Sequence, residues 1–169
     1  MGFFRQDDRM RHRSNHAARG FTLVEILIVV VILGILAAIV VPQFAGATEE
    51  SRRASFVSSL RVFGDAADYF SVREGTYVPD GSSGVCPPEF AEYVRAEEFE
   101  AGTPIGGVWD TEFNDSGVTS AIGVHFDGTG ETRDDAFMTL IDAMFDDGDL
   151  NTGRFQKLAA DRYYLIIED

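Results

Sequence analysis

The sequence predicts an α+β fold in which one long N-terminal helix packs on a small antiparallel sheet, with a second helix in the C-terminal half. Three features of the hydrophobic pattern predict it. An apolar run at residues 21–41 continues into an amphipathic helical stripe that ends near residue 74. After residue 107 the apolar residues recur at every second position, as they do in strands. Residues 134–146 then return to a helical period.

Residues 21–41 have the composition of a membrane span. Glu25 is their only charged residue, and a helix of this length spans roughly 30 Å, the thickness of a bilayer's hydrocarbon core. Five arginines against two aspartates give residues 1–20 a net charge of +3. By the positive-inside rule this end stays in the cytoplasm, so the remainder of the chain is exported.

Glu25 is the anomaly in the span, because a carboxylate in lipid is costly unless a partner is supplied. A cut between Gly20 and Phe21 would create a positive α-amino group four residues before Glu25. Since four residues are just over one helical turn, Glu25 could pair with its own new terminus or with that of a neighbouring subunit.

The possible cleavage bond and Glu25 both lie in the hexapeptide Gly20, Phe21, Thr22, Leu23, Val24 and Glu25, which the apolar run follows. They resemble the class III leader of type IV pilins and type II secretion pseudopilins. The resemblance implies that a prepilin peptidase cuts after Gly20 and methylates the amine of Phe21. It implies in turn that Glu25 guides assembly. Pro42 matches a proline near the end of the family's membrane segment, and its missing backbone donor predicts a helix kink there.

A plain signal anchor or a secretory signal peptide is the alternative for this segment. A secretory signal has a shorter apolar core, and its small-residue cleavage site lies beyond that core. Here the glycine precedes the apolar run, which continues into a helix. Neither alternative accounts for Glu25.

The expected organisation has three parts. Residues 1–20 are a leader peptide, residues 21–43 a transmembrane and filament-core helix, and residues 44–169 an exported globular domain of pilin-like architecture. We expect a single-pass protein of the inner (cytoplasmic) membrane, with this domain in the periplasm or at the cell surface. The whole chain carries −14, so residues 21–169 carry −17. So acidic a domain would repel a phosphate backbone, and no nucleic-acid partner is expected.

The resemblance implies a structural subunit of a type II secretion pseudopilus or type IV pilus-like filament. Its partners would be other pilin-like subunits in a polymer, the prepilin peptidase, the inner-membrane assembly platform and the membrane. A type IV pilin for adhesion, motility or DNA uptake is one alternative. A stand-alone membrane-anchored binding domain is another, and it predicts no processing at Gly20 and no dependence on Glu25.

Helical periods place the core-facing residues. One stripe runs along the end of the long helix, with Phe56, Leu60, Phe63, Ala67 and Phe70. The helix is expected to end near Glu74–Gly75, since glycine favours a C-terminal stop. The second helix is expected to turn five residues inward: Phe137, Leu140, Ile141, Met144 and Phe145.

The remaining elements are short. Residues 75–107 are rich in glycine, proline and acid, and they predict a long loop with one short helix at 89–97. One hairpin is expected from runs at 108–113 and 121–126, and a second from runs at 154–158 and 162–167.

Enzymatic chemistry is not expected. Once the leader is removed, His125 is the only histidine, and the chain has no nucleophile elbow, zincin motif, P-loop or paired CxxC. Cys86 is the only cysteine, so no intrachain disulfide can form, and we expect it to be a small, partly buried residue. Another device must therefore fasten the C-terminal part of the domain.

The acidic loop at 146–153 is the candidate metal site. Asp147, Asp149 and Asn151 alternate as oxygen ligands do in calcium loops. No cofactor is certain, and calcium is the candidate; major pseudopilins as a family have a C-terminal calcium site. The alternative, a solvated turn built on Gly148 and Gly153, is the simpler interpretation.

Three ligands leave a calcium shell incomplete. Acids of a second loop could complete it, and the candidates are Asp110, Glu112 and Asp115. The acidic loop, together with the missing disulfide, favours secretion over motility or adhesion.

Overall fold

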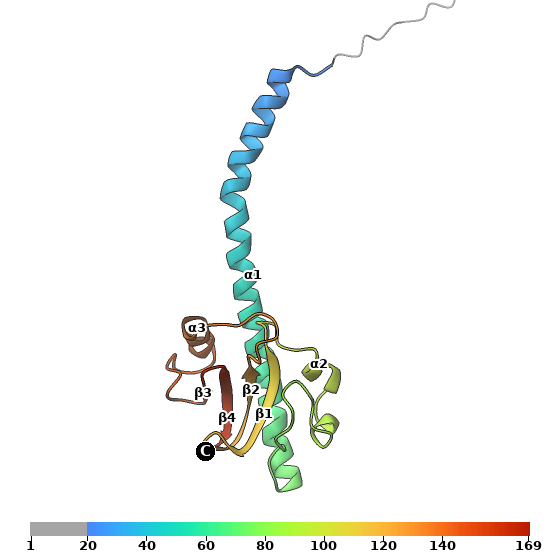
Figure 1. The fold of residues 1–169 in the computed structure, drawn as a ribbon, viewed down its shortest axis with the longest axis vertical. Coiled ribbons are helices and arrows are strands. Elements are labelled where there is room, and N and C mark those ends of the chain that lie inside the picture. The colour runs from blue at the N-terminus through green and yellow to red at the C-terminus, as the bar shows by residue number, and fades with distance from the viewer. Residues whose placement is uncertain (1–19) are drawn as a thin grey trace, which may run out of the picture. The chain divides into compact units, whose positions relative to one another are not determined.

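The computed structural model describes residues 20–169, without the side chains of residues 42–45, and the predicted leader before Gly20 lies outside the described residues. The chain divides into two compact units, Met1–Gln43 and Phe44–Asp169. The fold is α+β, as predicted, with one long helix, two short helical segments, a four-stranded sheet and a second helix (Figure 1).

The long helix α1 covers Leu23–Glu74. In the first unit its apolar residues are exposed on every side, and the helix is long and apolar enough to cross a membrane. Helical backbone is assigned through Pro42, so the helix is not locally melted there. The side chain of Pro42 is outside the described set, and the predicted kink stays a prediction.

In the second unit α1 supplies the predicted core stripe. All five stripe residues are at most 3% exposed. The helix ends at Glu74, where Gly75 adopts φ +68° and its amide donates to the carbonyl of Ser71 at 3.0 Å. Glycine reaches this left-handed conformation without the strain that a Cβ would add, so the predicted stop is confirmed.

The segment between α1 and the sheet differs from the prediction. Instead of one helix at 89–97 it contains a 3-10 turn, η1 (Phe90–Glu92), and a short helix, α2 (Ala96–Glu100). Arg95 separates them in an extended conformation, with φ −80° and ψ 109°. The break lets Phe90 and Phe99, nine residues apart, both become fully buried, which a single short helix would not have aligned.

The sheet is antiparallel, with strand order β1-β2-β4-β3 (Figure 1). Strands β1 (Val108–Asp115) and β2 (Val118–His125) extend two and three residues further into the predicted turn than expected. Only Ser116 and Gly117 remain as the loop, both at positive φ, and two such residues suit the tight turns that match strand twist. Strands β3 (Phe155–Ala159) and β4 (Arg162–Glu168) form the predicted second hairpin.

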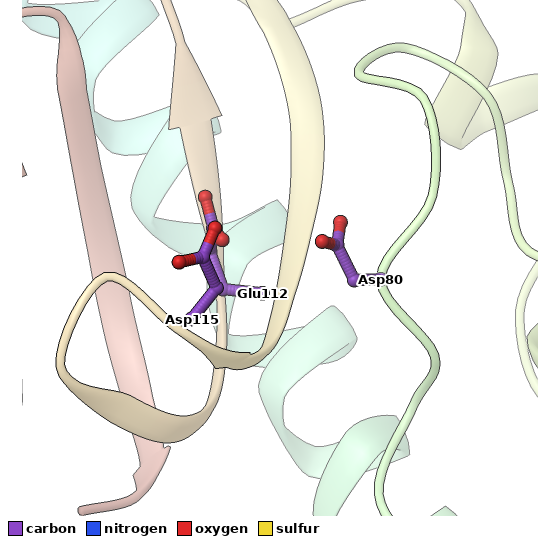
Figure 2. A group of neighbouring side chains, drawn as sticks. All are labelled: Asp80, Glu112 and Asp115. Atoms are coloured by element: carbon purple, nitrogen blue, oxygen red, sulfur yellow. The ribbon is translucent and has the colours of Figure 1, made fainter.

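The first hairpin brings acids together from separate parts of the chain. Glu112 and Asp115 of β1 lie opposite Asp80 of the preceding loop (Figure 2). Asp80 lies more than 30 positions before Glu112 in the sequence, so no local pattern predicts that it belongs to this group.

Helix α3 (Asp135–Phe145) begins as predicted, and the face that it presents to the core differs only in part from the predicted one. The side chain of Asp134 caps it by accepting a hydrogen bond from the amide of Phe137 at 2.9 Å. The buried residues are Met138, Ile141 and Asp142. Two of the five predicted inward residues, Leu140 and Met144, are 53% and 41% exposed. Ile141 is fully buried and Phe137 and Phe145 pack against the core, so the predicted face is confirmed in part, and the additional buried residues are Met138 and Asp142.

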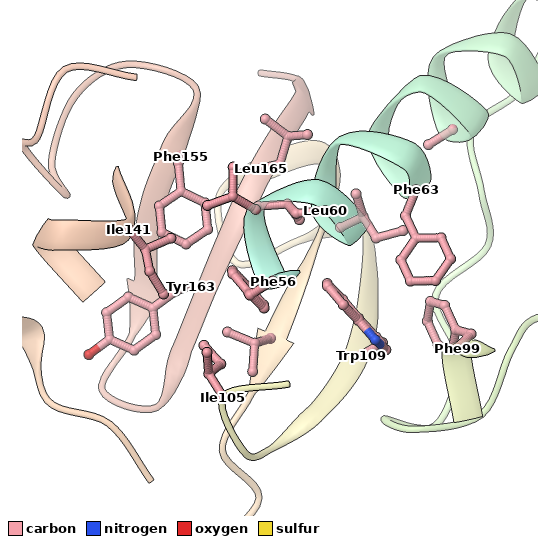
Figure 3. Packing of buried hydrophobic residues seen from close by; sticks show 14 of the residues in the cluster. Phe56, Leu60, Phe63, Phe99, Ile105, Trp109, Ile141, Phe155, Tyr163 and Leu165 are labelled. Atoms are coloured by element: carbon pink, nitrogen blue, oxygen red, sulfur yellow. The ribbon is translucent and has the colours of Figure 1, made fainter. Parts of the chain in front are cut away.

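The core lies between α1 and the sheet, and its centre is aromatic (Figure 3). The ring of Trp109 in β1 stacks on Phe56 with centroids 5.1 Å apart, and it meets Phe63 edge-on at 4.9 Å. Phe155 closes the other side of Phe56 at 6.4 Å. These rings bury a large apolar area and fix the side of the sheet on which α1 packs.

Candidate functional site

The N-terminal motif forms a reciprocal cap at the start of α1. The hydroxyl of Thr22 accepts a hydrogen bond from the amide of Glu25 at 3.2 Å. The Glu25 carboxylate accepts in return from the amide and the hydroxyl of Thr22, both at 2.8 Å. This is a capping box, in which a threonine and a glutamate three residues later satisfy each other's free backbone donors. The Thr-x-x-Glu spacing is its sequence signal, and the sequence analysis missed it.

The predicted cleavage bond lies directly before this cap. Gly20 and Phe21 are both exposed, Phe21 by 83%, and neither belongs to the helix. An exposed bond outside the helix and beside its capped start suits a peptidase. The geometry is compatible with the predicted roles of Gly20, Phe21 and Glu25, which remain predictions.

The surface behind the motif is apolar all around the helix. Leucine, isoleucine and valine side chains from Leu23 to Val41 are between 41% and 89% exposed. Full burial of one such side chain contributes about 1.5–3 kcal/mol. Water therefore cannot be the normal environment of this surface, and lipid or other protein must cover it.

The predicted calcium loop is held by its own hydrogen bonds. Asp147 accepts from the amide of Asp149 at 2.9 Å, and Asp149 accepts from the amide and side-chain nitrogen of Asn151 at 3.1 and 2.8 Å. The hydroxyl of Thr152 donates to Asp147 at 2.8 Å. The Asp149 carboxylate is thus hydrogen-bonded to Asn151 within the loop, as in turns that a side chain stabilises.

Asp147 alone of the three predicted ligands joins a compact acidic group. Its partners are Asp142 of α3 and Asp146, and the carboxylate oxygens that they offer lie within 4.8 Å of one another. Asp142 is 0% exposed. Burial, and then the charges of Asp147 and Asp146, raise the pKa of the Asp142 carboxyl to about 6. Asp142 was not predicted as a site residue, because a charged side chain on an amphipathic helix is expected to face solvent.

The acids expected to complete a calcium shell lie in the first hairpin and have partners of their own. Glu112 is 1% exposed and forms an ion pair with Arg162 of β4. Burial raises the pKa of the Glu112 carboxyl, and the Arg162 guanidinium partly opposes this shift. Asp115 accepts from the amide of Ser116 at 2.7 Å. Figure 2 shows this group of Asp80, Glu112 and Asp115. The guanidinium of Arg162 already supplies a positive charge to Glu112.

Asp110 belongs to a third polar network, around His125. Ser83 lies 2.9 Å from the Asp110 carboxylate and 2.8 Å from Nδ1 of His125. The hydroxyl of Tyr164 also donates to Asp110 at 2.8 Å, and Asp161 approaches Nε2 of His125 at 3.4 Å. The set contains a serine, a histidine and two aspartates, but the buried Asp110 competes with His125 for the Ser83 proton. Its chemistry is that of a polar clamp that fastens the loop at residue 83 to the sheet.

The chain combines a short capped motif, an exposed apolar helix and an α+β domain packed on the second half of α1, which is the architecture that the sequence predicted. The Prokaryotic N-terminal methylation motif matches residues 15–41. The chain is similar to type II secretion system core protein G of Pectobacterium carotovorum subsp. carotovorum, at 40% identity over 38% of this chain and 42% of that protein. It is 44% identical to the Klebsiella pneumoniae protein of the same name over 35% of this chain and 42% of that protein.

A second kind of relative carries the name fimbrial protein. The protein from Pseudomonas aeruginosa is 46% identical over 30% of this chain and 35% of its own length. This chain therefore spans less than half the length of each of these three relatives. No solved structure matches it significantly. Neither name describes an enzyme, and both describe parts of larger assemblies.

Proposed function

We propose that this chain is a filament subunit, cut between Gly20 and Phe21, methylated on Phe21 and polymerised through α1. One observation carries the proposal. The methylation motif contains a capped glutamate at the start of a helix whose apolar surface from Leu23 to Val41 is exposed. Such a helix needs lipid before assembly and neighbouring helices after it.

The membrane stage follows from the charge distribution. The arginine-rich segment before Gly20 holds the N-terminal end in the cytoplasm, and the acidic domain after residue 44 is exported. The protein is therefore a single-pass protein of the inner membrane before assembly, with its domain in the periplasm or at the cell surface.

The assembled stage follows from symmetry. Each α1 offers one apolar surface to the surfaces of other copies or of other pilin-like subunits. A contact of this head-to-tail kind does not close on itself, so it repeats into an open helical fibre. Glu25 would set the register, because its carboxylate can pair with the methylated amine of a neighbouring subunit.

A type II secretion pseudopilus is the first candidate among such fibres. Relatives of both the secretion and the fimbrial kind match the chain, over 38% and 30% of its length. The single cysteine, Cys86, is buried and cannot close an intrachain disulfide around the C-terminal loop. This sets the domain apart from pilins that fasten that loop covalently and favours the secretion type.

The mass of the protein extracted from membranes tests the proposal. Expressed beside an active prepilin peptidase, the chain should have the mass of residues 21–169 plus one methyl group. A Gly20→Val variant, which blocks the peptidase's small-residue site, should keep the mass of the uncut chain. If the native chain also stays uncut, it is a stand-alone anchored domain and the filament proposal is wrong.

A further inference from the structure

The turn of the first hairpin contains an asparagine and a serine whose side chains are both free. Asn114 and Ser116 are exposed, and neither the amide group of Asn114 nor the hydroxyl of Ser116 hydrogen-bonds to the described part of the chain. Short polar side chains in turns normally bond to a nearby backbone group, as Asp115 does by accepting from the amide of Ser116 at 2.7 Å. The turn therefore does not use its other two polar side chains to hold its shape.

Both residues also have a backbone conformation that most side chains avoid. Asn114 and Ser116 have φ +54°, and they are the only non-glycine residues at positive φ in the described part of the chain. Asparagine tolerates this left-handed region, but serine is not among the residues that tight hairpin turns prefer. The conformation is costly for a residue with a Cβ, and no hydrogen bond of the Ser116 side chain offsets the cost. Such an outlier points to a function.

The turn extends into open space. The ladder between β1 and β2 pairs Phe113 with Ser120 and Asp115 with Val118, but it does not pair Asn114. A Cβ added at Gly117 would meet no heavy atom of the described chain within 4 Å. Since Asn114 is itself exposed, a bulky group attached to its side chain would find room without displacing the hairpin.

The spacing of the two free side chains indicates their chemistry. Asn114, Asp115 and Ser116 form the tripeptide Asn-x-Ser, in which x is not proline, and this is the acceptor sequence for N-linked sugars on exported proteins. The chain has two other asparagines, Asn15 and Asn151, and neither is followed by a serine or threonine two positions later. The motif thus occurs once in the chain, in a surface turn of the globular unit.

We propose that the side-chain amide of Asn114 accepts a saccharide from a lipid-linked sugar diphosphate, with Ser116 as the recognition residue. Nδ2 of Asn114 forms a bond to the anomeric carbon of the sugar, and the bond between that carbon and the diphosphate oxygen breaks. The lipid diphosphate leaves with the electron pair and Nδ2 releases one proton, so the transfer needs no oxidant or reductant. The transferase acts on exported chains, so this inference rests on the export of the domain in the proposed function.

A sugar at Asn114 would also orient the domain in the filament. An attached saccharide is bulky and strongly hydrated, so it keeps the end of the first hairpin out of contacts between subunits. The end of the sheet that holds Ser116 and Gly117 then faces solvent in the polymer.

Mass spectrometry of the full chain, extracted from the membranes of the cells that produce it, tests this site. Trypsin releases residues 96–133 as one peptide, because no lysine or arginine lies between Arg95 and Arg133. Asn114 is the only asparagine in that peptide. In the native chain the peptide should carry the added mass of a saccharide, and fragmentation should place this mass on Asn114.

Two variants should lose the added mass from the peptide. Asn114→Asp keeps the shape of the side chain and its tolerance of positive φ, but it removes the amide nitrogen that accepts the sugar. Ser116→Gly removes the hydroxyl and relieves the left-handed serine, so this variant should unfold in urea no earlier than the native chain. Asn151→Asp is the matched control outside the motif, and it should keep the modification.

The same sample reports whether the chain has been cut at Gly20, so the site and the filament proposal can fail separately. An unmodified peptide from a cut chain would overturn the site and leave the filament proposal intact, and a modified peptide from an uncut chain would do the reverse. An uncut and unmodified chain would contradict both. Added mass that persists in Asn114→Asp but disappears in Ser116→Gly would place the sugar on the serine oxygen, and the assignment to Asn114 would be wrong.

Discussion

The carboxylate of Glu25 accepts two hydrogen bonds from Thr22, one from its amide and one from its hydroxyl, both at 2.8 Å. In a single chain the acid is therefore already partnered when it enters the membrane. A carboxylate with two local donors is easier to place in lipid than a free one. Assembly then requires Glu25 to share or exchange these donors with a neighbouring amine.

The first prediction concerns the hydroxyl of Thr22. Thr22→Val removes both the cap on the Glu25 amide and one donor to the carboxylate, so the first turn of α1 should fray. Amides of residues 23–25 should exchange with solvent about fivefold faster in detergent micelles. Thr22→Ser keeps the hydroxyl and is the matched control, with native exchange expected. Native exchange in Thr22→Val would show that the cap does not hold the helix start.

The second prediction concerns Glu25 itself. Glu25→Val removes the only charge between residues 21 and 41, so the chain should insert into the membrane at least as well as the native one. The same change should prevent the pairing that sets subunit register. Membrane extraction and electron microscopy of filaments measure the two effects separately. Glu89→Gln, an exposed acid of the globular unit, is the control. Native filament numbers from Glu25→Val would contradict the pairing role.

The third prediction concerns the ion pair of Glu112 and Arg162. Arg162→Met leaves a carboxylate that is 1% exposed without its counter-charge, which should cost about 3 kcal/mol at neutral pH. Loss of the guanidinium should raise the pKa of Glu112 further above its value in the unfolded chain. The folded state then holds a proton that the unfolded state has released, so the variant loses stability as pH rises through this window.

Urea unfolding at pH 4 and pH 8, followed by the fluorescence of Trp109, measures how much less stable Arg162→Met is than the native chain. This deficit should be small at pH 4, near the unfolded pKa of about 4.3, and reach its full value at pH 8. Arg95→Met is the control, since its pair with Glu98 is exposed and worth at most about 1 kcal/mol. Equal deficits of Arg162→Met at both pH values would show that Glu112 is not the group left unpaired.

The parts of the fold that were predicted correctly are those with a clear apolar period. The stripe from Phe56 to Phe70 follows from helical spacing, because one side of the helix is buried there. Both hairpins follow from short β-rich runs between turn residues, although the middle residues of β1, β2 and β4 are buried on both faces of the sheet. The same spacing locates the motif from Gly20 to Glu25, since an isolated charge in an apolar run needs no tertiary information to be noticed.

The face of α3 could not be predicted in this way. Its two phenylalanines lie at the boundary, where guanidinium groups cover them: Arg133 is 4.4 Å from the ring centre of Phe137, and Arg61 is 5.2 Å from that of Phe145. Aromatic rings covered by arginine side chains remain partly exposed, so the two phenylalanines do not mark the centre of the buried face of α3. The side chain of Asp142 on the same helix is fully buried. The groups around Glu112 and His125 join residues from separate elements, such as Asp80 with Glu112 and Ser83 with His125, and no local pattern indicates such contacts.

The last prediction tests how closely the loop after α3 surrounds the acidic group. Gly153 has φ +74°, and a Cβ there would collide with the carboxylate of Asp146 and lie 3.1 Å from that of Asp147. Gly128 has φ +83°, with no heavy atom within 4 Å of its Cβ position. Gly128→Ala should therefore lose only the conformational term, about 1–2 kcal/mol. Gly153→Ala should lose more, because it also displaces Asp146 from the amide of Arg154. Urea unfolding of both variants in chelator, followed by Trp109 fluorescence, measures the difference; equal losses would mean that the loop yields freely and does not hold the carboxylates in place.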